Sequence, residues 1–519
     1  MKVLFLNKKA KWIAATIAIL LAAAVLCAVL LTRPDETPLQ TASAAPTEAP
    51  TEAPTAVPTE APTKPPELVT RVDPSCVEAG YTRYEDAETG VIRIEDGAPA
   101  LGHSFVQRDS SRVCERCGYS EPVSGQSRLP RIELNGSMEG IGKADRVLLD
   151  FQFESDETQF SCYANTSWQG HSSLENAKKN YTIRLFDDEN LTMKHRLAFG
   201  SWHPEHKYVL KANYADATQS RNLICAHIWR SMAESRASLP DRLRSTVNLG
   251  AVDGFPVTVW VNGAFHGLYT MNLHKDDDLY DMRLGGRDAI MICNAQTMDE
   301  ALFRAEAAFI EDQSDWEVEF ATPEETQWAQ QHFNSLIRFV MEANDETFRA
   351  NLAQQLDVDA AIDYLLFIYA MGLTDSAAKD LVMLTYDGGP WIPTVYDMED
   401  AFGLSADGSS AEGPDAFLPS CQDGVWSSGT GSLLWDRLLQ QFGDRIIGRW
   451  QELRGGAFSQ EALTAQIAEM LDAVSEDWIQ MDLELYPGRN LIQDPRRQIL
   501  DYMEQRLLLL DDVLTTDRG

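Results

Sequence analysis

Carboxylates gather in two short segments of the second half of the chain. Asp375 lies in MGLTDSAAKD, and Asp380 follows it five residues later. Asp397 and Glu399 lie in VYDMEDAFG. Phosphoryl transfer needs a carboxylate that orients the acceptor hydroxyl and hard oxygen ligands for Mg²⁺, so this set of side chains is suited to that chemistry. A solvated acidic turn is the alternative, because exposed acids need no special explanation in a chain that has 79 of them.

Strand and helix patterns indicate how these carboxylates are positioned. Alternating apolar segments predict strands over 146–153, 179–186, 207–214 and 256–262. Later, apolar residues recur at intervals of three and four and predict helices over 326–342, 358–371 and 433–453. Between these helices a strand pair, 381–387 and 391–397, leads to the second acidic segment. The fold expected for 129–519 is therefore α+β with two lobes, a β-rich first half and a helical second half, whose junction is a usual place for a ligand.

The N-terminus predicts a membrane anchor. A basic flank, 1–11, carries four lysines and precedes a run without charge from residue 12 to 31. Such a run is long enough to cross a bilayer as one helix, and its positive flank should stay inside. We therefore expect a single transmembrane helix over 12–32, with the main domain outside the cytoplasm. A cleaved signal peptide is the alternative, with Ala42-Ser43-Ala44 as its site, although the run is longer than a usual signal segment.

A stalk and the overall charge complete the outline of the chain. Residues 33–68 repeat Pro, Thr, Glu and Ala, a composition typical of an extended polyproline spacer. The net charge is −35, which argues against binding nucleic acid through its phosphates. An acidic surface favours divalent cations and basic protein substrates, although solubility alone would also explain it.

A small module at 69–123 combines cysteines and a histidine. Cys114 and Cys117 form a C-x-x-C turn, and Cys76 and His103 precede it. Three thiolates and one imidazole would complete a tetrahedral structural zinc site. A disulfide between Cys114 and Cys117, or among the three cysteines, is the alternative outside the cytoplasm. The module resembles short cysteine-rich modules of surface proteins from Gram-positive bacteria.

The main domain resembles the CotH (spore coat protein H) family of atypical, secreted protein kinases, particularly its phage-associated branch. The resemblance implies a divergent kinase-like fold that transfers phosphate from ATP to protein Ser or Thr with Mg²⁺ or Mn²⁺. The segments that carry it follow in the family's order: WQGHSS with AKKNYTIRLF, YVLKANYADATQSRNLICAHIW, GAVDGFPVTVWVNGAFHGLYTMNLHKD, DSAAKDLVMLTYDGGPWIPTVYDMEDAFG and LLWDRLLQQFGDRIIGRWQELR.

The resemblance also implies roles for the four acids. Asp375 falls at the family's catalytic-loop acid, and Asp397 at its metal-binding acid. Asp380 falls where the family has Asn, and Glu399 where it has a second Asp. Asp for Asn keeps an oxygen ligand, whereas Glu for Asp could shift the ion by about 1 Å, which can cost about 10²-fold in rate. Loss of activity is therefore an open alternative.

Basic side chains on the strand side are candidates for binding the nucleotide. Lys179 is the first choice for the ATP phosphates, and Lys211 competes with it. Lys178 should point to the opposite face and be solvated. Arg221 is a candidate phosphate clamp, with an ion pair to Asp216 as the equal alternative.

Three functions follow from these observations. The first is a membrane-anchored, extracytoplasmic protein kinase with a protein substrate, for which basic proteins are the favoured class. The second is a nucleotide-binding or adhesion module that has lost catalysis. The third keeps the fold but transfers a different group from ATP, such as AMP.

Overall fold

We describe the fold on a computed structural model. It describes short stretches between residues 67 and 122 and, apart from 171, 201, 296–297, 312, 423–424 and 490, the chain from 129 to 515. The predicted anchor, 12–32, and the stalk up to 66 lie outside these residues, as do His103, Cys117 and the side chain of Cys114. The predicted zinc site is therefore not tested. Within the described ranges, no helix is both long and apolar enough to cross a bilayer.

The chain divides into two compact units, and each is described by itself. The first unit contains an antiparallel sheet of three strands in the order β1-β2-β3, and Cys76 is buried in this unit. Its strands are β1 (Glu67–Val72), β2 (Tyr81–Asp86) and β3 (Ile92–Asp96). Three further short strands follow along the chain: β4 (Phe105–Arg108), β5 (Ser111–Cys114) and β6 (Ser120–Pro122).

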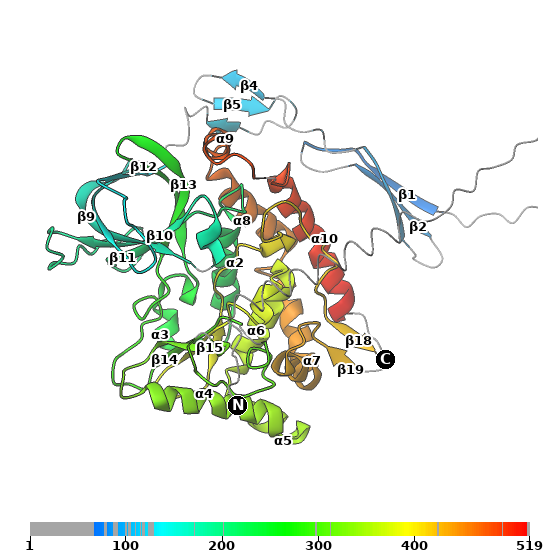
Figure 1. Ribbon diagram of the computed structural model, residues 1–519. Helices are drawn as coiled ribbons and strands as arrows, with labels where there is room; N and C mark the ends of the chain where they lie inside the picture. Colours follow the sequence, from blue (N-terminus) through cyan, green and yellow to red (C-terminus); the bar gives the residue numbers. More distant parts are fainter. Residues whose placement is uncertain are drawn as a thin grey trace, which may run out of the picture. The chain divides into compact units, whose positions relative to one another are not determined.

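The second unit contains a closed barrel of seven strands, in the order β10-β11-β13-β12-β7-β8-β9 (Figure 1). Neighbouring strands are antiparallel except β12 and β7, which are parallel. Alternate side chains fill the interior, which explains the period of two in the sequence. The strands are β7 (Arg131–Asn135), β8 (Val147–Glu154), β9 (Gln159–Gln169), β10 (Asn180–Phe186), β11 (Lys207–Lys211), β12 (Gly254–Val261) and β13 (Ala264–Leu273).

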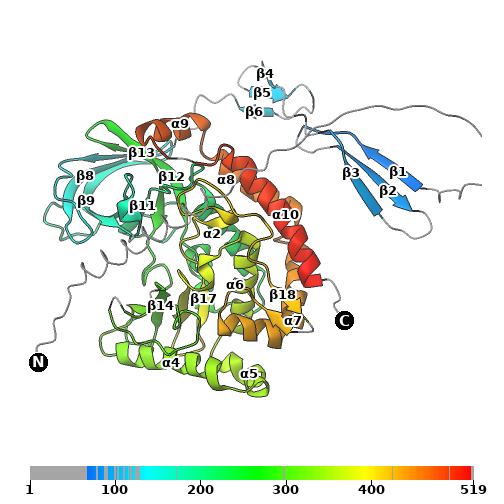
Figure 2. The same ribbon diagram turned by 45° about the vertical axis from the view of Figure 1, so that its right-hand side comes forward.

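The rest of the unit is mainly helical and contains a second sheet, in the order β15-β14-β16-β17 (Figure 2). That sheet consists of β14 (Ala289–Cys293), β15 (Trp316–Phe320), β16 (Val382–Thr385) and β17 (Ile392–Thr394). A hairpin, β18 (Ser420–Gln422) and β19 (Val425–Ser427), lies further along. The helices are α2 (Arg221–Glu234), α3 (Asp241–Arg244), α4 (Thr326–Glu342), α5 (Asp345–Asn351), α6 (Val358–Met371), α7 (Leu433–Arg454), α8 (Gln460–Asp472), α9 (Glu476–Leu485) and α10 (Pro495–Thr515). The predicted order, a β-rich half followed by a helical half, is confirmed.

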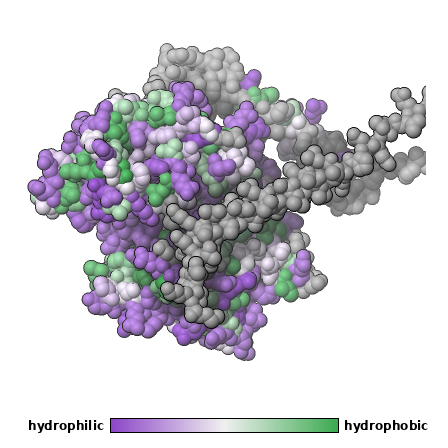
Figure 3. Space-filling view, in the orientation of Figure 1, coloured by the Kyte–Doolittle hydropathy of each residue, from purple (hydrophilic) through white to green (hydrophobic). Residues whose placement is uncertain are grey.

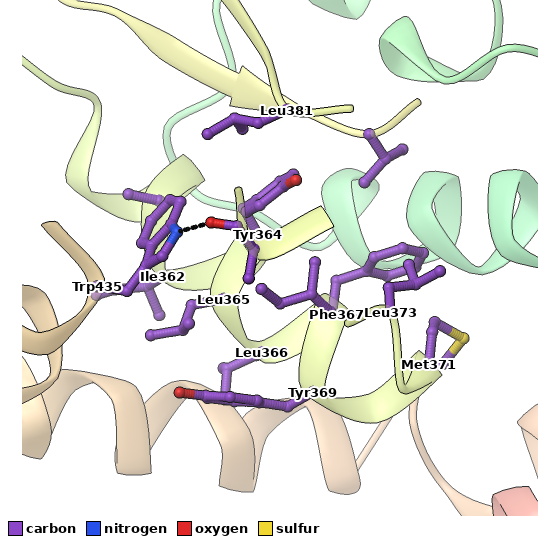
Figure 4. Close-up of a cluster of buried hydrophobic side chains, with 14 of the residues drawn as sticks. Ile362, Tyr364, Leu365, Leu366, Phe367, Tyr369, Met371, Leu373, Leu381 and Trp435 are labelled. Atoms are coloured by element: carbon purple, nitrogen blue, oxygen red, sulfur yellow. Dashed lines mark hydrogen bonds between the residues drawn. The ribbon is translucent and has the colours of Figure 1, made fainter. Parts of the chain in front are cut away.

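Helix α6 forms the centre of the helical core. Nearly all of its side chains are buried, and Tyr364 stacks on Trp435 of α7 with ring centroids 5.5 Å apart (Figure 4). Gly372 ends the helix in the left-handed conformation, at φ 68°, which relieves the cost that a Cβ would impose. The outer surface is different, since hydrophilic side chains cover most of the face shown in Figure 3. This distribution agrees with the net charge of −35.

Candidate active site

The first acidic segment follows α6 directly. Asp375 begins a single 3-10 turn, Asp375–Ala377. The core holds this turn by its backbone: Tyr364 Oη donates to the Ser376 carbonyl at 2.7 Å, and Trp435 Nε1, which carries the dashed bond in Figure 4, donates to the Ala377 carbonyl at 3.1 Å. The Asp375 side chain is 56% exposed, and its Oδ2 lies 3.2 Å from Lys379 Nζ. A fixed backbone with an exposed carboxylate can receive the hydroxyl of a large substrate.

The second acidic segment follows β17 and contains backbone strain. Asp397 has φ 46° and Phe402 has φ 61°, and Asp380 at the start of the hairpin has φ 60°. Residues other than glycine adopt this region at a cost of about 1–3 kcal/mol each, and such residues gather at functional sites. The hairpin β16–β17 brings Asp380 and Asp397 to the same end of the sheet.

Lys211, at the end of β11, joins the barrel to these carboxylates. Its Nζ lies 2.6 Å from Asp397 Oδ1 and 3.4 Å from Glu399 Oε2. Burial lowers the pKa of Lys211, but the two carboxylates raise it more, so it lies above its ordinary value. Burial raises the pKa of Asp397, and Lys211 outweighs that effect and leaves it lowered. The pair is therefore a partly buried ammonium and carboxylate, 12% and 28% exposed, and both are charged.

Asp380 is a further carboxyl group of the site, and its surroundings disfavour its ionised form. Burial, and next the neighbouring Asp397, raise its pKa well above its usual range, against the opposing effect of Lys379 at 3.7 Å. Asp400 is affected in the same way: burial, with Asp375 and then Asp397 nearby, raises its pKa to about 7. The sequence analysis did not select Asp400, although its position beside Glu399 was visible. The site thus holds more carboxylates than cations.

A cleft adjoins the pair of Lys211 and Asp397. Its other walls include the apolar side chains of Val209 and Leu273 from the barrel and Met398 from the acidic loop. Apolar walls suit a flat base, and the ammonium group of Lys211, which also lines the cleft, suits phosphate oxygens. The remaining lining residues are Gln169, Asn222, Val252, Asn272, His274, Lys275 and Tyr396.

The donor set fits Mg²⁺ or Mn²⁺ bound together with a nucleotide. Among the residues that the structure describes, no group of three Asp, Glu, His or Cys side chains could hold a metal by itself. Mg²⁺ in such sites is usually held by one or two carboxylates with phosphate oxygens and water, so an enclosing cage is not required. The carboxyl groups of Asp397 and Asp380 offer oxygen donors, and they lie close enough for Asp397 to raise the pKa of Asp380, a repulsion that a cation between them would relieve. Asp397 and Asp380 are the residues that would hold it.

Two other basic residues named from the sequence lie away from the carboxylates. Lys179 Nζ donates to the carbonyls of Leu174 at 2.6 Å and Asn176 at 2.5 Å, so it closes a turn rather than reaching the acidic cluster. Arg221 is fully buried, and the alternative ion pair forms, with Nε 3.4 Å from Asp216 Oδ1. The Arg221 side chain is 0% exposed and does not line the cleft, whereas Lys211 is partly exposed and does, so Arg221 is not placed to contact a nucleotide.

The expected solvation of Lys178 is wrong. Its side chain is buried, its Nζ lies 2.9 Å from Asp482 Oδ1 of α9, and it donates to the Leu268 carbonyl. Arg489 contacts the same carboxylate at 3.0 Å. Burial lowers the pKa of Lys178 to about 8, against the opposing effect of Asp482. The partner lies so far along the chain that the local strand pattern could not reveal it.

Asp482→Ala should therefore destabilise the protein strongly. The substitution leaves two buried cations without their carboxylate, a change that typically costs about 3–5 kcal/mol. Urea denaturation measures the free energy of unfolding. Asp477→Ala, at an exposed position of the same helix, is the control and should cost under about 1 kcal/mol. Equal losses in the two variants would contradict the importance of this ion pair.

Asp400 gives the stability a pH dependence. Its folded pKa is about 7, above its ordinary value of 3.8, so the folded state holds a proton that the unfolded state loses between these values. This contribution to stability is complete below about pH 4 and disappears as the pH rises through 7. Asp400→Asn should be more stable than the parent at pH 8 and equal to it near pH 4. Urea denaturation at both pH values tests this, with the exposed Asp145→Asn as the control that should show no such difference.

The fold and the site together define an α+β protein with a barrel, a helical half, and a cleft lined by a lysine and several carboxylates. Residues 167–510 match the family model described as CotH kinase protein. Because the match covers more than half of the chain, the protein belongs to the CotH kinase family, as the sequence analysis predicted. The match does not address the phage-associated branch, which stays a prediction. A comparison with curated proteins gave no match.

Proposed function

We propose that this protein is an ATP-dependent protein kinase that phosphorylates Ser or Thr of a protein substrate with Mg²⁺ or Mn²⁺. The observation that carries the proposal is the ion pair of Lys211 and Asp397, 2.6 Å apart, beside a cleft in a chain of the CotH kinase family. The excess of carboxylates around this pair is what a site for a metal–nucleotide complex needs.

Each residue has a distinct role in the proposed reaction. Lys211 binds the ATP phosphates as a point charge, and Asp397, released from Lys211, holds the metal with Asp380. Asp375 orients the acceptor hydroxyl and accepts its proton, for which its exposure is suitable. A bound cation would neutralise the negative charge that develops on the phosphoryl group during transfer. Glu399 keeps Lys211 in place through its contact at 3.4 Å.

The location proposed for this reaction is the outer side of the cell membrane, in the envelope of a Gram-positive bacterium. The run without charge at 12–31 and its basic flank support this location. The stalk then places the domain at a distance from the bilayer, and the net charge of −35 favours basic proteins as substrates.

Incubation of the full-length chain with labelled ATP, Mg²⁺ or Mn²⁺ and a basic protein tests the proposal. Label on Ser or Thr is the expected result, and its absence with both metals would overturn it. The second candidate is an inactive nucleotide-binding protein, favoured by Asp380 and Glu399 in place of the family's Asn and Asp. Thermal stabilisation by ATP and Mn²⁺ without transfer would support that candidate. Mass spectrometry distinguishes phosphate from AMP on the modified protein.

A further inference from the structure

The acidic loop from Asp397 to Gly403 adopts a conformation that two of its residues do not favour. Asp397 and Phe402 have positive φ, at 46° and 61°, while Gly403 has φ 74°, which glycine adopts readily. A backbone of this kind persists only where its surroundings hold it. Asp397, Glu399 and Asp400 lie on this loop, so whatever holds the loop also sets the positions of these three carboxylates.

Helix α2 holds the loop from one side. Asn222 Oδ1 accepts a hydrogen bond from the Met398 N–H at 2.8 Å. Arg221 Nη1 donates to the Ala401 carbonyl at 2.6 Å. The first two residues of α2 thus bind peptide groups on both sides of Glu399 and Asp400. This contact explains why Arg221 is fully buried beside the acidic loop: it binds the backbone of the loop and not the carboxylates of the site.

Helix α10 holds the loop from the other side through Gln498. Its Nε2 donates to the Phe402 carbonyl at 2.7 Å, and its Oε1 accepts from Arg221 Nη2 at 2.7 Å. One amide therefore joins the loop directly to the arginine that holds the preceding peptide group. The Gln498 amide thus acts as donor and as acceptor at once, and neither Glu nor Met, which have a similar size, can do both.

Packing along α10 restricts the loop further. The ring of Tyr502 meets Phe402 edge to face, with centroids 6.2 Å apart. A Cβ added to Gly403 would lie 3.1 Å from Tyr502 Cε2 and 2.6 Å from the Glu412 carbonyl oxygen. Just before α10, the Ile492 N–H donates to the Gly408 carbonyl at 3.1 Å. The C-terminal segment therefore contacts the acidic loop and the chain that follows it at several points.

We infer that Gln498 is a positioning residue for the acidic loop, and that helix α10 belongs to the machinery that sets the distance between Asp397 and its cationic partners. Outer hydrogen-bond partners of metal ligands commonly affect metal affinity or activity by about 10- to 100-fold. The expected effect on phosphate transfer rests on the proposed function. The effect of Gln498 on the position of the loop does not, because it can be measured without any activity.

Two substitutions at Gln498 test the inference. Gln498→Glu keeps an acceptor for Arg221 but places an oxygen against the Phe402 carbonyl, and Gln498→Met removes both bonds without adding charge. Gln505→Glu makes the first change at an exposed position of the same helix and is the control. Hydrogen exchange of the full-length chain should be faster at the amides of 398–404 in both Gln498 variants and unchanged in the control. Unchanged exchange at these amides in both variants would overturn the inference.

Activity provides the second measurement. In both Gln498 variants, the Mn²⁺ concentration for half-maximal transfer should rise by about 10-fold or more, while the control keeps the parent value. A lower stability with an unchanged metal requirement would show a merely structural residue and would overturn the inference. If the parent protein transfers no phosphate, the proposed function fails, and the hydrogen-exchange result alone decides the role of Gln498.

Discussion

Asp397→Asn should reduce phosphate transfer by about 10³-fold, the scale seen when one charge-stabilising group is removed from an active site. The amide keeps the size of the side chain but loses the charge that pairs with Lys211 and would hold the metal. The metal requirement should also change, because Asp380 would remain as the main carboxylate ligand. Labelled ATP with a basic protein measures the rate, and a titration with Mn²⁺ measures the requirement.

Stability is expected to respond in a different way from activity. Asp397 lies beside Asp380, whose pKa is raised first by burial and then by this neighbour. Removing the charge of Asp397 relieves that repulsion while it removes the contact with Lys211, so the two effects oppose each other. We therefore expect a large loss of activity with a small change in the free energy of unfolding. Equal transfer by the variant and the parent would contradict the assigned role.

Asp387→Asn is the matched control. It makes the same chemical change in the same hairpin, at the exposed turn between β16 and β17. The turn lies at the opposite end of these two strands from Asp397. Transfer by this variant should equal that of the parent. A similar loss in both variants would show that the hairpin is merely sensitive to substitution.

The sequence was sufficient for features that depend on neighbouring residues. The helices predicted over 326–342 and 358–371 have the bounds of α4 and α6, because their apolar side chains repeat with the helical period over several turns. The hairpin 381–397 was visible in its two apolar runs and its Gly-Gly-Pro turn. That hairpin alone brings Asp380 and Asp397 together.

Features that depend on distant residues could not be predicted in this way. The closure of the barrel requires the pairing of β9 with β10 and of β12 with β7, which no local pattern specifies. The buried pair of Lys178 and Asp482 shows the same limit, since a lysine beside a strand is ordinarily solvated. Gln498 gave no signal either, because its partners lie on α2 and on the acidic loop.

The choice between Lys179 and Lys211 depends on neighbouring residues and on distant ones. Each lysine lies in a predicted strand, Lys179 at the start of 179–186 and Lys211 within 207–214, so period and charge did not separate them. Lys179 comes just before β10 and turns back to two carbonyls, whereas Lys211 is the last residue of β11 and faces Asp397. Lys211 enters the site because it ends its strand at the acidic cluster, whereas Lys179 precedes its strand and contacts a local turn.

Lys211→Met should therefore reduce transfer by about 10²- to 10³-fold and raise the KM for ATP. Methionine has a similar length but no charge, so the phosphates lose their cation and Asp397 and Glu399 lose their common partner. The variant should also bind Mn²⁺ more readily in the absence of ATP, because an ion would no longer compete with the ammonium group for Asp397. Isothermal titration with Mn²⁺ measures this second effect independently of turnover.

Lys179→Met distinguishes this assignment from its rival. The Lys179 ammonium group binds the carbonyls of Leu174 and Asn176, so its loss should lower the stability of the turn Ser172–Glu175 without changing the Mn²⁺ titration. Transfer should fall by less than about 10-fold, a change of under about 1.4 kcal/mol in the barrier. The opposite ranking, with Lys179→Met inactive and Lys211→Met active, would assign the phosphates to Lys179 and leave Lys211 as a structural partner of Asp397. Two substitutions of the same type, one just before β10 and one at the end of β11, thus decide which lysine binds the nucleotide.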